Sequence, residues 1–357
     1  MSSTSRLAAT FAVQARACES LGSPLYASLL RRCVADIEGG GPVAVVLRGH
    51  ENDPGPSGLA LRLLGAVHRL VLDGEATQLA AHYPSVGGDG DAEAAWSALK
   101  AALTEHSARI RPLLDAAPQT NEVGRAAGLL GGLLHLAAQF ALPIELHEIG
   151  SSAGLNLRAD AYCYRDADGG HLWGPAGSPV QLLDAWRGPL PPVTAPLEVI
   201  RRLGSDVAPL DPANHDDATT LQSYVWADMT SRLERLRAAL SVAVQQPTPV
   251  DQLDAIEAVQ RLQPVRGRVV VLWHSVMWQY VAREAQAALT ARLAELGARA
   301  DGQAPLAHLF LEPTRREPGA EHEFLLVLQT WPGTRRILAC APGHGLPVSW
   351  ETPTLLR

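Results

Sequence analysis

A chain of 357 residues, of which 47% are hydrophobic and 19% charged, has enough apolar side chains for one large or two medium-sized cores and is not disordered by composition. Its net charge of −7 argues against non-specific binding to nucleic acid, because such binding needs many lysine and arginine side chains to neutralise phosphates. Since no stretch approaches the roughly 18 apolar residues of a membrane helix and the first residues lack a signal-peptide pattern, we expect a cytoplasmic protein that contacts no membrane.

The first part of the chain follows a helical pattern. Leucine and valine recur on one face of residues 59–72, and residues 128–140 repeat this spacing. We therefore predict an N-terminal helical region over residues 1–142.

The remainder, residues 143–357, alternates apolar strand-like runs with helical segments. The predicted strands are 144–149, 197–203, 269–273, 306–311, 324–330 and 337–341, and the predicted helices are 219–240 and 276–296. Alternation of this kind is typical of an α/β domain with a doubly wound, mostly parallel sheet. The W-P-G-T run at 331–334 predicts a tight turn, and hence an antiparallel hairpin at the end of the domain.

The first predicted strand ends in a glycine-containing turn, within the phrase E-I-G-S-S-A-G-L-N-L. Glu148 lies near the C-terminal end of this strand, and Gly150, Ser152 and Gly154 occupy the positions of a tightened nucleotide-binding turn. Glycine allows the backbone to approach a ligand closely. We therefore expect a cofactor at this turn, with Asn156 either capping the next helix or contacting the cofactor.

This pattern resembles the first motif of the class I S-adenosylmethionine-dependent methyltransferases. The resemblance implies a Rossmann-like sheet with an antiparallel C-terminal hairpin, S-adenosylmethionine as the cofactor, and methyl transfer to a small molecule. It also implies that Glu148 orients the turn or meets the methionine ammonium group, and that Asp206 or Asp211 accepts hydrogen bonds from the ribose. The sequence departs from that pattern at Ser152, where many of those enzymes have glycine, and at 313–323, a loop where they have a helix.

Four phrases together are similar to a bacterial family, the domain-of-unknown-function family numbered 2332. They are Q-T-N-E-V-G-R (119–125), E-I-G-S-S-A-G-L-N-L (148–157), R-L-G-S-D-V-A-P-L-D (202–211), and W-H-S (273–275) with Tyr280. The resemblance covers most of the chain. It implies a methyltransferase-like cofactor turn and no assigned reaction.

The same turn also allows a different reading, because residues 150–154 match G-x-S-x-G, the nucleophile elbow of α/β-hydrolases. Ser152 would then be the nucleophile of a serine hydrolase. Its partners, in the order Ser, Asp, His, would be Asp228 or Asp254 and His308, His322 or His344. The long helical region before the turn argues against this alternative, since an elbow normally follows several strands. A non-catalytic nucleotide-binding module is a further alternative.

His274 is the predicted acid or base of the reaction. It follows the strand predicted at 269–273, at the sheet edge where ligands bind, and histidine titrates near neutral pH. The competing interpretation is a hydrogen-bonded histidine in the wall of the cleft.

The phrase at 119–125 places donors, acceptors and both charges at the head of an apolar helix. An N-terminal cap at Thr120 or Asn121 would explain part of this composition. We expect the remaining polar groups to recognise a small-molecule substrate. The predicted substrate-binding residues are Gln119, Asn121, Glu122, Arg125 and Tyr280.

The cysteines give no sign of a metal or redox site. Cys18, Cys33, Cys163 and Cys340 are widely separated and form no C-x-x-C pair. We therefore expect reduced thiols and no bound metal.

Overall fold

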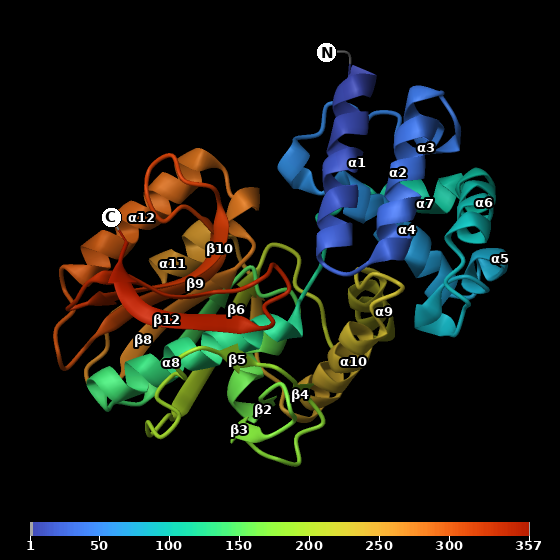
Figure 1. Cartoon of the computed structure of the whole chain (residues 1–357). Helices are drawn as coiled ribbons and strands as arrows, with labels where there is room; N and C mark the ends of the chain where they lie inside the picture. The colour runs from blue at the N-terminus through green and yellow to red at the C-terminus, as the bar shows by residue number, and fades with distance from the viewer. Residues whose placement is uncertain (1–2, 357) are drawn as a thin grey trace. The chain divides into compact units, whose positions relative to one another are not determined.

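The computed structural model describes residues 3–356, which form two compact units (Figure 1). The helical unit comprises the chain up to Thr120 together with residues 214–237. The sheet unit comprises the remaining residues. Each unit packs around its own cluster of buried apolar side chains.

The helical unit consists of helices and connecting loops over its described residues. They are α1 (Ser3–Ser20), α2 (Pro24–Glu38), α3 (Pro42–Val46), η1 (Gly55–Ser57), α4 (Leu59–Leu72), α5 (Thr77–Ala80), η2 (Pro84–Val86), α6 (Ala92–Glu105), α7 (Ser107–Leu113), α9 (His215–Ser223) and the first part of α10 (Thr230–Gln245). Helix α4 has the bounds predicted for it and is central, since it contacts α1, α5, α6, α7 and α9.

Two polar side chains stabilise the packing of the helical unit. His68 of α4 is fully buried, with Nδ1 3.1 Å from the Ser223 carbonyl oxygen and Nε2 2.8 Å from Ser85 Oγ. Burial lowers the pKa of His68 to about 4, so this ring is neutral. Asp228, which precedes α10, accepts a hydrogen bond from the backbone N–H of Leu25 at the start of α2.

The sheet unit contains a nine-stranded and a three-stranded sheet within residues 121–356. The strands are β1 (Ile144–Ile149), β2 (Cys163–Arg165), β3 (His171–Trp173), β4 (Gln181–Leu182), β5 (Trp186–Arg187), β6 (Val199–Asp206), β7 (Val250–Gln252), β8 (Val269–Ser275), β9 (Leu306–Thr314), β10 (Glu323–Trp331), β11 (Arg335–Cys340) and β12 (Val348–Leu355). The helices are η3 (Val123–Arg125), α8 (Ala126–Phe140), η4 (Leu155–Ala161), the rest of α10, α11 (Ala255–Gln260), η5 (Trp278–Tyr280) and α12 (Arg283–Gly297).

The large sheet has the order β5-β12-β11-β10-β9-β8-β1-β6-β7. Strands β7, β6, β1, β8 and β9 are parallel, whereas β10, β11 and β12 extend the sheet as antiparallel strands. Among the parallel strands, β6 and β7 follow β1 in the chain and lie on one side of it, whereas β8 and β9 come later and lie on its other side. The strand order therefore switches between β1 and β8. The predicted α/β class, with a mostly parallel sheet and antiparallel C-terminal strands, is confirmed.

Most predicted strands correspond to observed ones. Strand β1 has the predicted bounds 144–149, and the other five predictions correspond to β6, β8, β9, β10 and β11. The helix predicted at 219–240 is instead two helices, α9 and α10. The helix predicted at 276–296 begins later, as α12, because Val276 takes a left-handed φ of 51° after β8. Strand β12 was missed because its sequence V-S-W-E-T-P-T-L includes a charge and a proline.

Helices cover both faces of the large sheet (Figure 1). Helix α8 packs on one face, where a Cβ added to Gly132 would lie 2.4 Å from the Leu309 side chain, so glycine permits the close approach. On the other face, leucines of α12 form a cluster with Leu272 of β8. Because α8 packs on the sheet and α9 packs on α4, the compact units differ from the regions 1–142 and 143–357 expected from the sequence.

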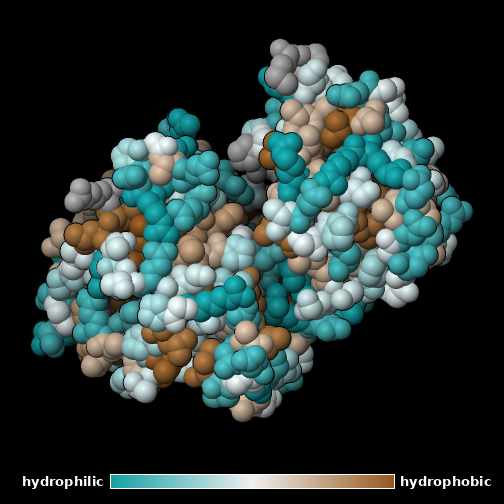
Figure 2. Space-filling view, viewed as in Figure 1, coloured by the Kyte–Doolittle hydropathy of each residue, from teal (hydrophilic) through white to brown (hydrophobic). Residues whose placement is uncertain are grey.

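The surface of the chain is mixed in polarity. On the face seen in Figure 2, hydrophobic residues form small, separate patches among hydrophilic ones. Large exposed apolar side chains such as Val13, Leu183 and Val207 are far apart in the sequence, and single exposed apolar residues are normal for folded proteins. Over residues 3–356, no helix is long and apolar enough to cross a membrane.

Candidate functional site

The turn after β1 lies at the point where the strand order of the sheet switches. Glu148, near the end of β1, is paired in register with Trp273 of β8 on one side and with Gly204 of β6 on the other. In open α/β sheets, ligands bind outside the carboxyl ends of the strands at such a switch. The sheet therefore brings the predicted cofactor turn to the position where this architecture places ligands.

The turn has an unusual backbone. Gly150 and Gly154 both have a φ of 64°, and a Cβ added to Gly150 would lie 3.0 Å from the Met277 side chain. Ser152 also has a positive φ, of 52°, although it carries a side chain. A non-glycine residue in this region is uncommon and costs free energy, and such strain clusters at functional sites. The backbone N–H of Gly154 donates to the Ser151 carbonyl at 2.7 Å and closes the turn.

Two polar side chains hold this turn in place. Asp206, the last residue of β6, accepts from the backbone N–H of Ser152 at 2.8 Å and from that of Ala208 at 2.9 Å. Asn121 accepts from the backbone N–H of Leu155 at 3.0 Å. The sequence indicated a cap at Thr120 or Asn121 for the helix that follows them in the chain. Asn121 instead caps η4, the helix that follows the turn.

The cap expected from Thr120 or Asn121 is provided by Glu122 instead. Its carboxylate accepts from the backbone N–H of Gly124 at 3.0 Å, at the start of η3. Asn156, 2% exposed, donates from Nδ2 to the Glu122 carbonyl at 3.3 Å. Its Oδ1 atom is buried and has no hydrogen-bond partner among residues 3–356.

Glu148 is the second group with an unsatisfied acceptor. Its side chain is 3% exposed, and Oε1 accepts from Trp273 Nε1 at 3.1 Å. Oε2 is buried without a hydrogen-bond partner in the described part of the chain. Burial raises the pKa of Glu148 to about 8, against the opposing effect of the Trp273 hydrogen bond, and the negative charge of Asp206 raises it further. The carboxyl is thus largely protonated at neutral pH and would ionise beside a cationic ligand.

Arg125 links the start of α8 to the end of β8. Its guanidinium donates from Nε to the Gly343 carbonyl at 3.1 Å and from Nη1 to the Ser275 carbonyl at 3.3 Å. Val276 follows with a φ of 51°, which is rare for a β-branched residue. Both edges of the candidate site, after β1 and after β8, therefore contain residues in a strained conformation.

His274 lies on the opposite face of the sheet from Trp273 and Glu148. Adjacent residues of a strand point to opposite faces, so His274 points away from the face on which Trp273 contacts Glu148. His274 Nδ1 is 2.8 Å from Glu312 Oε1, and its Nε2 is 2.9 Å from His308 Nε2. Both ring nitrogens are therefore engaged away from the turn.

Glu312 is a residue that the sequence analysis did not select. The phrase H-L-F-L-E of β9 carries His308, Phe310 and Glu312 at alternate positions, which places them on one face of a strand. This alternation is the feature of the sequence from which Glu312 could have been selected together with His308. The register with β8, which pairs His274 with Phe310, could not be read from the sequence.

Three further predicted residues lie in other segments of the chain. Asp211 is in the loop after β6, where its carboxylate accepts from the backbone N–H of Ala213 at 2.9 Å. Tyr280 is in η5 and is 43% exposed. Gln119 belongs to the helical unit. The turn is therefore surrounded by Glu148, Asn156, Asp206, Asn121 and Glu122, all from the sheet unit.

Four of the five residues considered as partners of Ser152 in a serine hydrolase have other contacts. Asp228 caps α2, and Asp254 caps α11, where it accepts from the backbone N–H of Glu257 at 2.8 Å. His308 contacts His274, and His322 Nε2 accepts from Arg315 Nε at 3.2 Å. A catalytic triad needs the nucleophile, a histidine and a carboxylate within hydrogen-bond reach of one another. These pairings do not link any of the four residues to Ser152.

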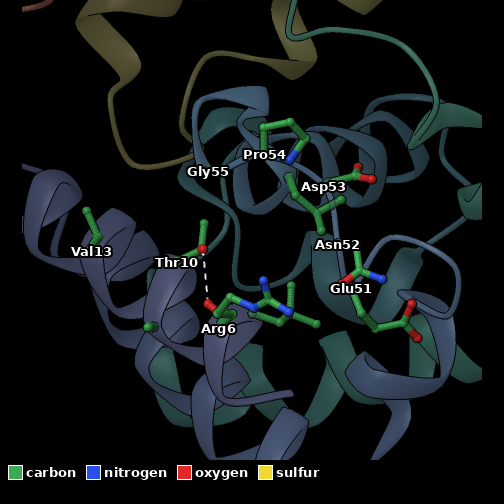
Figure 3. A pocket seen from close by; sticks show the side chains of 11 residues that line it. Arg6, Thr10, Val13, Glu51, Asn52, Asp53, Pro54 and Gly55 are labelled. Carbon is green, nitrogen blue, oxygen red and sulfur yellow. Dashed lines mark hydrogen bonds between the residues drawn. The ribbon is translucent and has the colours of Figure 1, made fainter. Parts of the chain in front are cut away.

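The helical unit has a cavity of about 370 Å³ between α1 and the segment before α4 (Figure 3). Arg6 and Thr10 line it from α1, and Glu51 and Asp53 line it from the opposite wall. Asp53 is engaged by Arg62 and by His50 Nδ1, the latter at 3.0 Å. The ion pair with Arg62 and the contact with His50 account for the charge of Asp53 without a ligand.

Metal-ligating side chains do not gather in the part of the chain that the structure describes. Among residues 3–356 there is no group of three or more His, Cys, Asp or Glu side chains that could hold a metal ion. The four cysteines are free thiols.

Replacing Asn121 with alanine should destabilise the sheet unit by about 1 kcal/mol, because the buried N–H of Leu155 loses its acceptor. Asn121→Asp keeps an oxygen at this position and serves as the matched control. Urea denaturation measures the free energy of unfolding of both variants and of the parent protein. Equal stability of Asn121→Ala and the parent protein would show that this hydrogen bond does not hold the turn.

Comparison with protein families matches residues 8–350 to a family described as "Uncharacterized protein conserved in bacteria (DUF2332)". No curated protein and no solved structure matches the chain. The matched range contains the turn after β1, the end of β6 and the start of α8.

Proposed function

Because the chain belongs to this uncharacterised bacterial family, its reaction has to be inferred from the site, and we propose that it binds S-adenosylmethionine at the turn after β1 and transfers the methyl group to a small molecule. The observation that carries this proposal is the pair of buried acceptors beside the turn, Glu148 Oε2 and Asn156 Oδ1, which lack hydrogen-bond partners within residues 3–356. Buried polar atoms are normally satisfied, so two such acceptors at a ligand-binding edge call for a donor.

The ammonium group of the cofactor is a suitable donor for Glu148. Ionisation of the buried Glu148 carboxyl, whose pKa is about 8, costs free energy when no cation is near. A neighbouring positive charge reduces this cost. Charge-assisted hydrogen bonds are also stronger than neutral ones. Glu148 would therefore hold the amino-acid end of the cofactor.

Asp206 would hold the other end of the cofactor. A carboxylate has about four lone-pair sites, of which the backbone N–H groups of Ser152 and Ala208 use two. The remaining sites suit ribose hydroxyl groups, which a carboxylate after the second strand commonly binds in such sheets. Gly150 and Gly154 would serve the turn by allowing its left-handed φ, because the space beside them is already filled by the side chains of Met277 and Val250.

S-adenosylmethionine would supply a methyl group already activated on its sulfonium sulfur. The chain then has to position the acceptor in line with this group and keep competing water away. His274 is not assigned to proton removal, because its ring lies on the other face of the sheet and both of its nitrogens are engaged.

Calorimetric titration with S-adenosylmethionine and S-adenosylhomocysteine tests the proposal. We expect saturable binding of both to the parent protein, and at least about tenfold weaker binding to Glu148→Gln, which loses one charge-assisted hydrogen bond worth about 1.5–3 kcal/mol. Glu145→Gln is the matched control, since Glu145 is on the same strand and faces away, with its carboxylate on His147 and Arg268. Circular dichroism confirms that each variant is folded.

Two results would contradict the proposal. The first is the absence of binding of either ligand to the folded parent protein. The second is covalent labelling of Ser152 by a fluorophosphonate, which would favour the serine hydrolase, for which the positive φ of Ser152 is a suitable backbone.

A further inference from the structure

A second cavity lies on the α12 face of the large sheet, within the sheet unit and on the opposite side from the turn contacts of Glu148. Its volume is about 460 Å³. Side chains of β8, β9, β10, β11 and α12 line it, together with the loop after β9. The residues that matter for its chemistry are His274, His308, Glu312, Trp278, Trp331 and Arg335.

A chain of hydrogen bonds leads from a buried carboxylate to the cavity. Glu312 Oε1 accepts from the backbone N–H groups of Met277 at 3.0 Å and Trp278 at 3.2 Å, and lies 2.8 Å from His274 Nδ1. Because Glu312 Oε1 already accepts from these two backbone N–H groups, it acts as an acceptor toward His274, and Nδ1 of His274 carries the hydrogen. His274 Nε2 then lies 2.9 Å from His308 Nε2, so His308 donates to it when His274 is neutral.

Aromatic rings hold this chain rigidly. The His274 ring stacks between Trp278, with ring centres 4.9 Å apart, and Phe310, with ring centres 5.4 Å apart. Interplanar angles of 14° and 5° confirm that all three rings are nearly parallel. The Trp331 side chain adds a further apolar surface to the lining. The cavity therefore combines flat apolar walls with an ordered set of polar groups, as ligand sites commonly do.

Two polar groups of the cavity can take a further partner, namely one oxygen of Glu312 and the guanidinium of Arg335. Glu312 is 4% exposed, and its Oε2 atom is buried with no hydrogen-bond partner in the described chain. The Arg335 guanidinium lies 5.4 Å from the centre of the Phe310 ring, and within residues 3–356 no carboxylate is within 4.0 Å of it. Arg335 is exposed, so its guanidinium can meet an anion that enters the cavity from solvent.

We propose that this cavity binds a small organic carboxylate, whose charged group pairs with Arg335 and whose apolar body lies against the aromatic walls. Arginine suits this task because its planar fork matches the geometry of a carboxylate. If the ligand also carries a hydroxyl or protonated acid group, Glu312 Oε2 is the acceptor available for it. This proposal concerns a cavity lined by other residues than the turn after β1 and does not rest on the methyltransferase proposal.

Benzoate is a suitable probe, and benzyl alcohol is its uncharged counterpart. In calorimetric and NMR titrations of the full chain, we expect benzoate to bind saturably, shift the histidine side-chain resonances and bind at least tenfold more tightly than benzyl alcohol. Arg335→Gln should weaken benzoate binding at least tenfold. Arg336→Gln is the matched control, because Arg336 is the next residue of β11 and donates to Gln139 of α8 on the opposite face at 3.1 Å.

A second variant protects the test against a folding defect. Thr290 is exposed on α12 and lines the cavity, so Thr290→Trp should fill the cavity and abolish benzoate binding without entering the core. S-adenosylmethionine titration of the same variants should be unchanged, which separates the two sites. The proposal is overturned if benzoate does not bind the folded parent protein, if it binds no better than benzyl alcohol, or if folded Arg335→Gln and Thr290→Trp retain full affinity.

Discussion

Glu148→Gln should remove a loss of stability that the parent protein undergoes as the pH rises. The glutamate of the unfolded chain ionises near its ordinary pKa of 4.5, whereas burial holds the native carboxyl protonated until about pH 8. Between these values the native state binds more protons, so the free energy of unfolding falls with rising pH, by up to about 1.4 kcal/mol per pH unit. The destabilisation is absent below pH 4.5 and complete above pH 8. Glutamine cannot ionise and keeps an acceptor for Trp273 Nε1.

Urea denaturation at pH 5, 7 and 9 measures this effect. The stability of Glu148→Gln relative to the parent protein should rise across the three pH values. Glu145→Gln should show no such trend over this range: burial acts to raise the pKa of Glu145, but its contacts with His147 and Arg268 outweigh burial and lower it, so its contribution to stability changes only below pH 4.5. Parallel pH profiles for the parent protein and Glu148→Gln would mean that Glu148 is already ionised in the native state.

Gly204→Val should destabilise the sheet unit by about 3 kcal/mol or more, because the site has no space for a side chain. A Cβ added to Gly204 would lie 2.7 Å from Ser151 Oγ, 2.9 Å from Val250 Cγ2 and 3.1 Å from Leu157 Cδ1. Since Ser151 belongs to the turn and Leu157 to η4, the new methyl groups would displace the turn that is proposed to hold the cofactor. We therefore expect loss of S-adenosylmethionine binding together with the loss of stability.

Gly177→Val is the control for this substitution. A Cβ at Gly177 would meet no atom within 4 Å, so the same change in side chain should alter stability by no more than about 0.5 kcal/mol. Thermal and urea denaturation of both variants provide the comparison. If Gly204→Val is as stable as Gly177→Val, the turn can move to accept a side chain and is not held against β6 as tightly as the contacts indicate.

The sequence identified those features of the site that depend on neighbouring residues. The apolar run before Gly150 predicted β1, and the left-handed φ values of Gly150 and Gly154 agree with the choice of glycine there. Glu148 near the end of β1 follows from where the apolar run stops, whereas the second run was predicted to end at 203 and left Asp206 and Asp211 as alternatives after it. Local hydrophobic patterns and glycine positions determine these features, so one sequence is sufficient to predict them.

The features that depend on distant residues could not be predicted in this way. His274 was predicted to be the acid or base because it follows the strand predicted at 269–273, but its neighbour Trp273 is the residue that contacts Glu148. Because side chains alternate along a strand, Trp273 and His274 must point to opposite faces of the sheet. Only the packing of the sheet determines which of them shares a face with Glu148. Asn121 was expected to cap its own helix and instead bonds to Leu155, a contact across 34 positions of the chain.

The cap of α2 also has a consequence for the order in which the protein folds during synthesis. Ser23 and Leu25, at the start of α2, both donate to the carboxylate of Asp228, which leaves the ribosome some 205 residues later. By then the residues of β1 and β6 have already been made, although β8 has not. Helix α2 must therefore remain uncapped while the second unit begins to form, and a nascent chain that stops before Asp228 should hold the helical unit in a less stable state.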